Sequence, residues 1–163
     1  MSTTMLVLDD GFEFDFSLMA IHCSLEDYRM AFMINKCMGL RLARTKKDLT
    51  FEGYGFDVGF SRYLFEDEKK YITYNLIGNK CKARINQQVA GSGLFADVEQ
   101  STVKTINLVP EHKSADYLLM YDAHMKGSSI NLFLNQLKEI PQIITVYEVE
   151  VEGLKSKTNL IFE

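Results

Sequence analysis

The chain has 163 residues, with 18 lysines and arginines against 22 aspartates and glutamates, and therefore a net charge of −4. Hydrophobic residues make up 47% and charged residues 25%, which is typical of a folded domain and excludes a disordered chain. The negative net charge argues against a protein whose main function is to bind the phosphate backbone of a nucleic acid. No apolar run approaches the roughly 20 residues that a membrane-spanning helix needs. We expect one domain over residues 1–163.

The first predicted elements are a strand over residues 18–23 and a helix over residues 25–38. Ser24 precedes the helix as a candidate N-cap, and Gly39 follows it as a C-terminal stop. The apolar stripe expected to face the core repeats with the helical period. It consists of Tyr28, Ala31, Phe32 and Ile34.

Strands are then expected over residues 60–65 and 71–77, joined by a polar hairpin connection. The dipeptide Gly78-Asn79 predicts a tight turn into a further strand over residues 80–85. Residues 86–102 contain Gly91 and Gly93 and indicate a long loop, which is also the one possible joint in the chain.

The second half is predicted to contain a strand pair over residues 103–109 and 115–121, a helix over 130–140 and a long strand over 143–151. Pro141 ends the helix, because the residue before a proline is disfavoured in helical geometry. Many strands with only two helices favour an α+β fold, with a mainly antiparallel or mixed sheet and both helices packed on it. By analogy alone, residues 115–151 look like part of a ferredoxin-like or ACT-type unit.

Two predicted strands carry charges of opposite sign at alternate positions. One presents Lys80, Lys82 and Arg84, and the other presents Glu148 and Glu150. If they share one side of a sheet as neighbours, each opposite pair contributes roughly 0.2–1 kcal/mol. The cationic strand also allows a single-stranded nucleic-acid platform as an alternative, which the net charge disfavours.

A resemblance to a known family rests on the segment Val-Pro-Glu-His-Lys-Ser-Ala-Asp-Tyr at residues 109–117. This segment resembles the signature of the bacterial IPExxxVDY family, with Val109 in place of isoleucine and Ala115 in place of valine. Other segments that resemble the family are residues 24–29, 79–81, 93–95, 140–143, 154–157 and 159–162. The resemblance implies a small cytoplasmic protein and assigns no catalytic residue.

The same segment has a physical interpretation of its own. Pro110 cannot donate to a sheet ladder and marks the end of a strand, and the polar residues after it suit a turn. A carboxylate at the start of the next strand commonly accepts backbone N–H groups. We therefore expect residues 109–117 to shape a turn. The alternative is that Glu111, Asp116 and Tyr117 face a ligand.

For the remaining motifs, a structural role is favoured over a role in ligand binding or catalysis. Residues 91–96 match G-x-G-x-x-A, but a dinucleotide site needs a helix after the turn, and strand-like residues follow here. The acidic residues between 9 and 15 alternate with phenylalanines, which favours a half-buried extended segment over a cation site. No histidine or cysteine pair has zinc-ligand spacing. Cys23 lies near a predicted helix start, so an activated thiol is an alternative to a buried one.

These observations favour a cytoplasmic, non-enzymatic binding or assembly protein. The first residues contain no secretory signal, and three widely spaced cysteines favour reduced thiols. We expect self-association or another protein partner, no cofactor, no metal and no membrane. The alternatives are a small-molecule-binding, ACT-like regulatory module with a pocket near residues 110–117, and an enzyme that uses scattered residues.

Overall fold

The computed structural model describes residues 16–51, 58–87, 100–122 and 128–162. The acidic N-terminal residues 9–15 and the glycine motif at 91–96 lie outside this part of the chain. The possible joint was predicted at residues 86–102. The structure describes residues 86–87 and 100–102 of this segment, and they belong to the paired strands β7 and β8. In chain order the elements are β1 Ser17–Cys23, α1 Asp27–Met38, β2 Ala43–Arg44, β3 Leu49–Phe51, β4 Val58–Phe60, β5 Arg62–Asp67, β6 Ile72–Gly78, β7 Lys80–Gln87, β8 Gln100–Asn107, a 3-10 turn at Pro110–His112, β9 Tyr117–Asp122, α2 Ser128–Lys138, β10 Ile143–Val149 and a second 3-10 turn at Lys157–Leu160.

Six strands form the main sheet in the order β10-β1-β9-β6-β5-β2, and every neighbouring pair is antiparallel. The elements β1-α1-β6-β9-α2-β10 therefore have the connectivity and strand order of a ferredoxin-like unit. β5 and β2 extend its sheet on one side, and β7 and β8 form an insertion between β6 and β9. The α+β prediction is confirmed.

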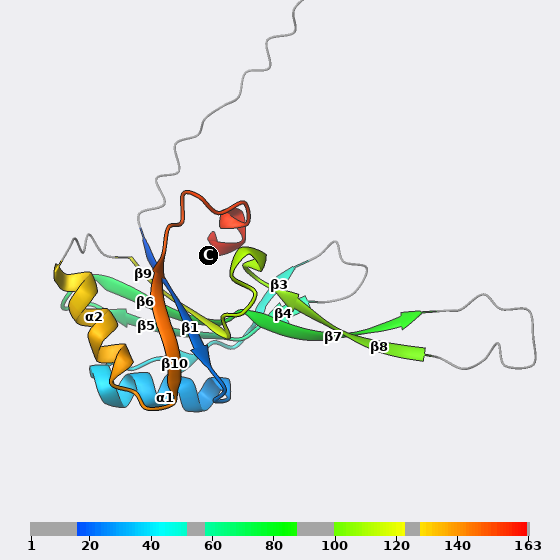
Figure 1. Cartoon of the computed structure of the whole chain (residues 1–163). Coiled ribbons are helices and arrows are strands. Elements are labelled where there is room, and N and C mark those ends of the chain that lie inside the picture. The colour runs from blue at the N-terminus through cyan, green and yellow to red at the C-terminus, as the bar shows by residue number, and fades with distance from the viewer. Residues whose placement is uncertain (1–15, 52–57, 88–99, 123–127, 163) are drawn as a thin grey trace, which may run out of the picture.

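Side chains on both faces of the sheet are buried. On one face α1 and α2 pack through Met30, Ile34, Phe133 and Leu137. On the other face the cover comes from β4, the turn before β9 and the C-terminal segment, which lies across the sheet from the helices (Figure 1). The sequence predicted the helical layer, whereas this second cover was not predicted.

The core face of α1 differs from the predicted stripe. Tyr28 and Phe32 are 57% and 64% exposed, whereas Met30, Ala31 and Ile34 are buried. Apolar residues occupy more than half of the circumference of this helix, so periodicity alone does not select the buried face.

The predicted ends of α1 are partly correct. The helix begins at Asp27 with Glu26 as N-cap and without a capping side chain, so the predicted cap at Ser24 is wrong. Gly39 ends the helix at φ 66°, in the left-handed region that glycine adopts without strain, as predicted.

The hairpin predicted at Gly78-Asn79 is wrong, whereas the strand predicted after it is present as β7. β6 pairs with β5 and β9, and β7 leaves the main sheet to pair with β8. The expected pairing of residues 103–109 with 115–121 is wrong for the same reason, because β8 pairs with β7 and β9 lies between β1 and β6. The two-stranded β7–β8 arm extends away from the main sheet (Figure 1).

The predicted charge pairing within one sheet is also wrong. Lys80, Lys82 and Arg84 belong to the β7–β8 arm, whereas Glu148 lies on β10 at the edge of the six-stranded sheet, with Glu150 just after it. The cationic and acidic strands of one chain are not neighbours. β8, which pairs with the cationic strand β7, contains no aspartate or glutamate. β1, which pairs with β10, contains no lysine or arginine.

Candidate functional site

Asn79 organises the junction between β6, β7 and the turn before β9. Its side chain is fully buried, and Nδ2 donates to the carbonyl oxygens of His112 at 2.9 Å and Ala115 at 3.0 Å. Its Oδ1 accepts the N–H of Val109 at 2.9 Å, and its backbone carbonyl accepts the N–H of Leu108 at 2.9 Å. One side chain thus pairs three main-chain groups of a turn that has no strand ladder of its own.

Asp116 connects this junction to the end of β1 and the start of β7. Its Oδ2 accepts the backbone N–H of Cys23 at 2.9 Å, and its Oδ1 lies 2.8 Å from Nζ of Lys80. Its own N–H donates to the carbonyl of Ile21 at 2.9 Å. Both carboxylate oxygens are therefore used in positioning three strands.

Tyr117 connects β9 to the segment that leads into α1. Its hydroxyl donates to the carbonyl of Leu25, and the ring is buried. Burial first, and then the charge of Asp27, raises the pKa of Tyr117, so the hydroxyl stays protonated and remains a donor at neutral pH.

Glu111 holds the C-terminal segment. Its Oε1 accepts the backbone N–H of Ser156 at 2.9 Å, and its Oε2 accepts the Ser156 hydroxyl at 2.7 Å. Partial desolvation acts to raise the pKa of Glu111, but the hydrogen bonds from Ser156, together with those from the backbone N–H groups of Glu111 and Lys155, outweigh it and lower the pKa to about 2. Nearby, Nδ2 of Asn159 donates to the carbonyl of Leu108 at 2.9 Å, which adds a second connection to the same segment.

We expect Glu111→Gln to lower the free energy of unfolding at pH 7 by less than about 1 kcal/mol, because the group is open to solvent. The folded-state pKa of about 2 lies below the ordinary value of about 4.3. The stabilisation from Glu111 is therefore complete above about pH 4.3 and is lost as the pH falls toward 2. Urea unfolding of both proteins at pH 7 and at about pH 3 measures the difference.

The exposed Glu152→Gln is the matched control, and we expect it to have little effect at either pH. A difference between wild type and Glu111→Gln that stays constant over this range would contradict the role of the Glu111 carboxylate.

The three predicted ligand-facing residues belong to separate hydrogen-bond sets. Glu111 binds the C-terminal segment, Asp116 binds β1 and β7, and Tyr117 binds the entry to α1. This arrangement agrees with the turn-shaping interpretation of residues 109–117. Sequence reasoning missed Asn79, because an asparagine after glycine is a typical turn signal and carries no local sign of burial.

Tyr147 of β10 lies between two histidines, another grouping that the sequence did not indicate. Its ring centroid lies 5.9 Å from that of His22 and 5.6 Å from that of His112, and its hydroxyl lies 2.9 Å from Nδ1 of His112. Across the described ranges, His, Cys, Asp and Glu side chains form no group of three suited to a metal ion.

The Cys23 thiol does not match the activated-thiol alternative. The residue is 1% exposed and lies four positions before the first residue of α1. Burial, more than any nearby charge, raises the pKa of the Cys23 thiol, whereas an activated thiol has a lowered pKa.

β10 is a long open edge of the main sheet. Within the described part of the chain it pairs on one side with β1 and on the other side with nothing. The opposite edge of the sheet, β2, is only two residues long. The β1–β10 register shifts between His22 and Cys23, which leaves Ile144 out of the ladder and 78% exposed. From Thr145 to Val149 the pairing is regular.

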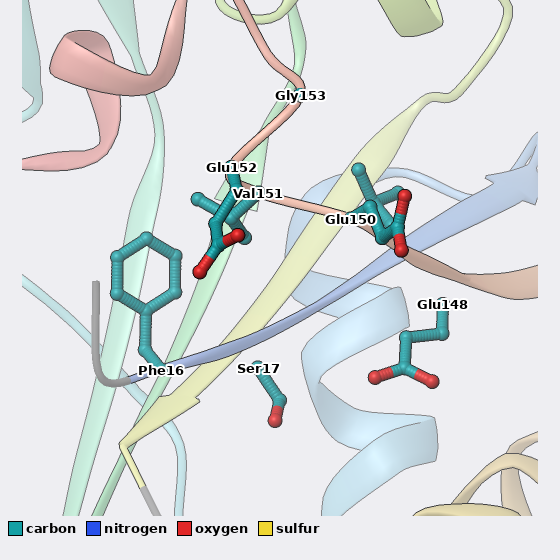
Figure 2. Close-up of a pocket in the computed structure, with 8 residues that line it drawn as sticks. Phe16, Ser17, Glu148, Glu150, Val151, Glu152 and Gly153 are labelled. Atoms are coloured by element: carbon teal, nitrogen blue, oxygen red, sulfur yellow. The ribbon is translucent and has the colours of Figure 1, made fainter. Parts of the chain in front are cut away.

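An open cavity of about 560 Å³ lies where β10 ends. Its lining includes Glu148, Glu150 and Glu152, together with Ser17 at the start of β1 and Phe16 just before it, and Figure 2 shows Glu152 next to Phe16. None of the three carboxylates forms an ion pair with a cation of the described residues. This cavity is acidic and lies on different residues from the pocket expected near residues 110–117.

No family model, no curated protein and no solved structure matches this chain. No helix in the described residues has the length and apolar character needed to cross a membrane.

Proposed function

We propose that this protein is a non-enzymatic binding or assembly protein of the bacterial cytoplasm, and that it binds a partner protein by adding one of the partner's strands to the open edge of β10. The observation that carries the proposal is the unpaired side of the seven-residue strand Ile143–Val149. The resemblance of residues 109–117 to the IPExxxVDY family stays a prediction that agrees with it.

The composition of β10 suits strand addition. Six of its seven residues are β-branched or aromatic, and the seventh is Glu148. Protein edge strands are commonly protected by charged residues, by proline, by shortness or by β-bulges. β10 has one charge, Glu148, and one irregularity at Ile144, and it has no proline and is seven residues long. The irregularity at Ile144 affects only its first residues. An added strand gains main-chain hydrogen bonds along the regular part, and alternate side-chain positions provide specificity.

Site-specific photo-crosslinking tests the proposal. A benzophenone amino acid replaces Ile144 at the edge or, as the matched control, Leu132 on α2, since both residues are exposed and apolar. In cells of the source organism we expect protein adducts from position 144 and none from position 132. Equal adducts from both positions, or none from position 144, would remove the proposal.

A further inference from the structure

We propose that the strand added to β10 is β7 from a second copy of this chain, with Arg84 and Lys82 opposite Glu148 and Glu150. The inference rests on the proposed function, because it names the partner of the same edge. It also accounts for two charged strands that the fold keeps apart within one chain.

Both strands have an unpaired side. Within the described residues β7 pairs only with β8, and β10 pairs only with β1. Figure 1 shows that the β7–β8 arm extends away from the six-stranded sheet. On β7 the side chains of Lys82 and Arg84 are exposed, whereas Ala83 between them is buried in the core that includes β4. A two-stranded ribbon is marginally stable by itself, and pairing with a further strand would stabilise it.

The charges of the two strands are complementary. The arm strands carry four cations, Lys80, Lys82, Arg84 and Lys104, and no carboxylate, in a chain whose net charge is −4. Lys80 is already paired with Asp116 of its own chain. Lys82 and Arg84 are exposed, and neither forms an ion pair with a carboxylate of the described residues. The unpaired carboxylates around the cavity provide the opposite charge.

The spacing of the charges also matches. Lys82 and Arg84 are two residues apart on β7. Glu148 on β10 and Glu150, the first residue after β10, are also two residues apart. Antiparallel pairing that puts Arg84 opposite Glu148 puts Lys82 opposite Glu150, because opposite positions run in reverse order. The same register puts the small side chain of Ala83 opposite Val149.

A second copy supplies both halves of the contact. Each chain carries one cationic arm and one acidic edge, so two copies that exchange arms form the same contact twice, as a two-fold dimer requires. The attraction is electrostatic, and we therefore expect self-association to weaken as salt is raised.

Charge reversal tests the pairing. In one variant the arm is reversed by Lys82→Glu and Arg84→Glu, and in a second variant the edge is reversed by Glu148→Lys and Glu150→Lys. Sedimentation velocity of the full chain at low salt is expected to show self-association of the wild type, weakened at least about tenfold in each variant. An equimolar mixture of the two variants is expected to associate again, because each acidic arm meets a reversed, cationic edge and each cationic arm meets an acidic edge.

Lys46→Glu with Lys47→Glu is the matched control for the arm variant, because both lysines are exposed and the charge change is the same. Circular dichroism establishes that each variant is folded, and only folded variants are compared. A monomeric wild type, association that survives either reversal, or a mixture that stays monomeric would overturn the inference.

The crosslinking at position 144 separates this inference from the proposed function. Adducts with a different protein, together with a monomeric wild type, would leave the proposed function standing and overturn the pairing of copies. Adducts between two copies that disappear in the arm variant and persist in the lysine control are the expected result. The absence of any adduct at position 144 would overturn both.

Discussion

Asn79→Ala is expected to lower the free energy of unfolding by about 3–5 kcal/mol. The substitution leaves three main-chain groups without their partner, namely the carbonyls of His112 and Ala115 and the N–H of Val109. A buried polar group that loses its partner costs about 1–3 kcal/mol, and alanine is too short to replace any of the three bonds. Urea unfolding followed by circular dichroism measures the loss.

Asn159→Ala provides the control for this prediction. Asn159 also donates its amide to a main-chain carbonyl, that of Leu108, but it makes one such bond and is only partly buried. We expect a loss of about 1 kcal/mol. If Asn79→Ala costs no more than Asn159→Ala, the turn before β9 does not depend on the Asn79 side chain.

The helices could be predicted from the sequence, whereas the role of Asn79 could not. Both helices were predicted to within a few residues, because apolar period, Gly39 and Pro141 are local signals. Gly78-Asn79 also carries a local signal, for a tight turn, and that signal was misleading. The burial of Asn79 depends on groups 30 to 36 positions away, which no local pattern contains.

The same limit applies to the candidate site. The alternation of charges on β7 and on residues 148–152 was visible in the sequence. Sequence could not place β10 at the end of the strand order or direct β7 out of the main sheet, because strand order is set by long-range pairing. Glu111, Asp116 and Tyr117 were named from the sequence as candidate ligand-facing residues. Their partners in the structure lie 36 to 93 positions away, and no local pattern contains them.

Leu118→Ala and Leu119→Ala are each expected to lower the free energy of unfolding by about 3–5 kcal/mol, which is the usual range for a leucine that leaves a cavity in a packed core. Both residues are fully buried in β9, and as consecutive strand residues they point to opposite faces. Leu119 packs on the helical side, and Leu118 packs on the side covered by β4 and the C-terminal segment. Urea unfolding of both variants measures the losses.

Equal losses of unfolding free energy at Leu118 and Leu119 test for the cover on the sheet face opposite the helices, which the sequence did not predict. If helices alone covered the sheet, Leu118 would face solvent, and its truncation would cost less than about 0.5 kcal/mol, the usual limit for a surface residue. Val103→Ala on the arm, at a side chain that is 56% exposed, supplies that surface reference. A loss at Leu118 close to the loss at Leu119 therefore requires the second cover. The Asn79 and Glu111 bonds lie at the edge of that cover, because Asn79 bonds the turn before β9 and Glu111 bonds the C-terminal segment.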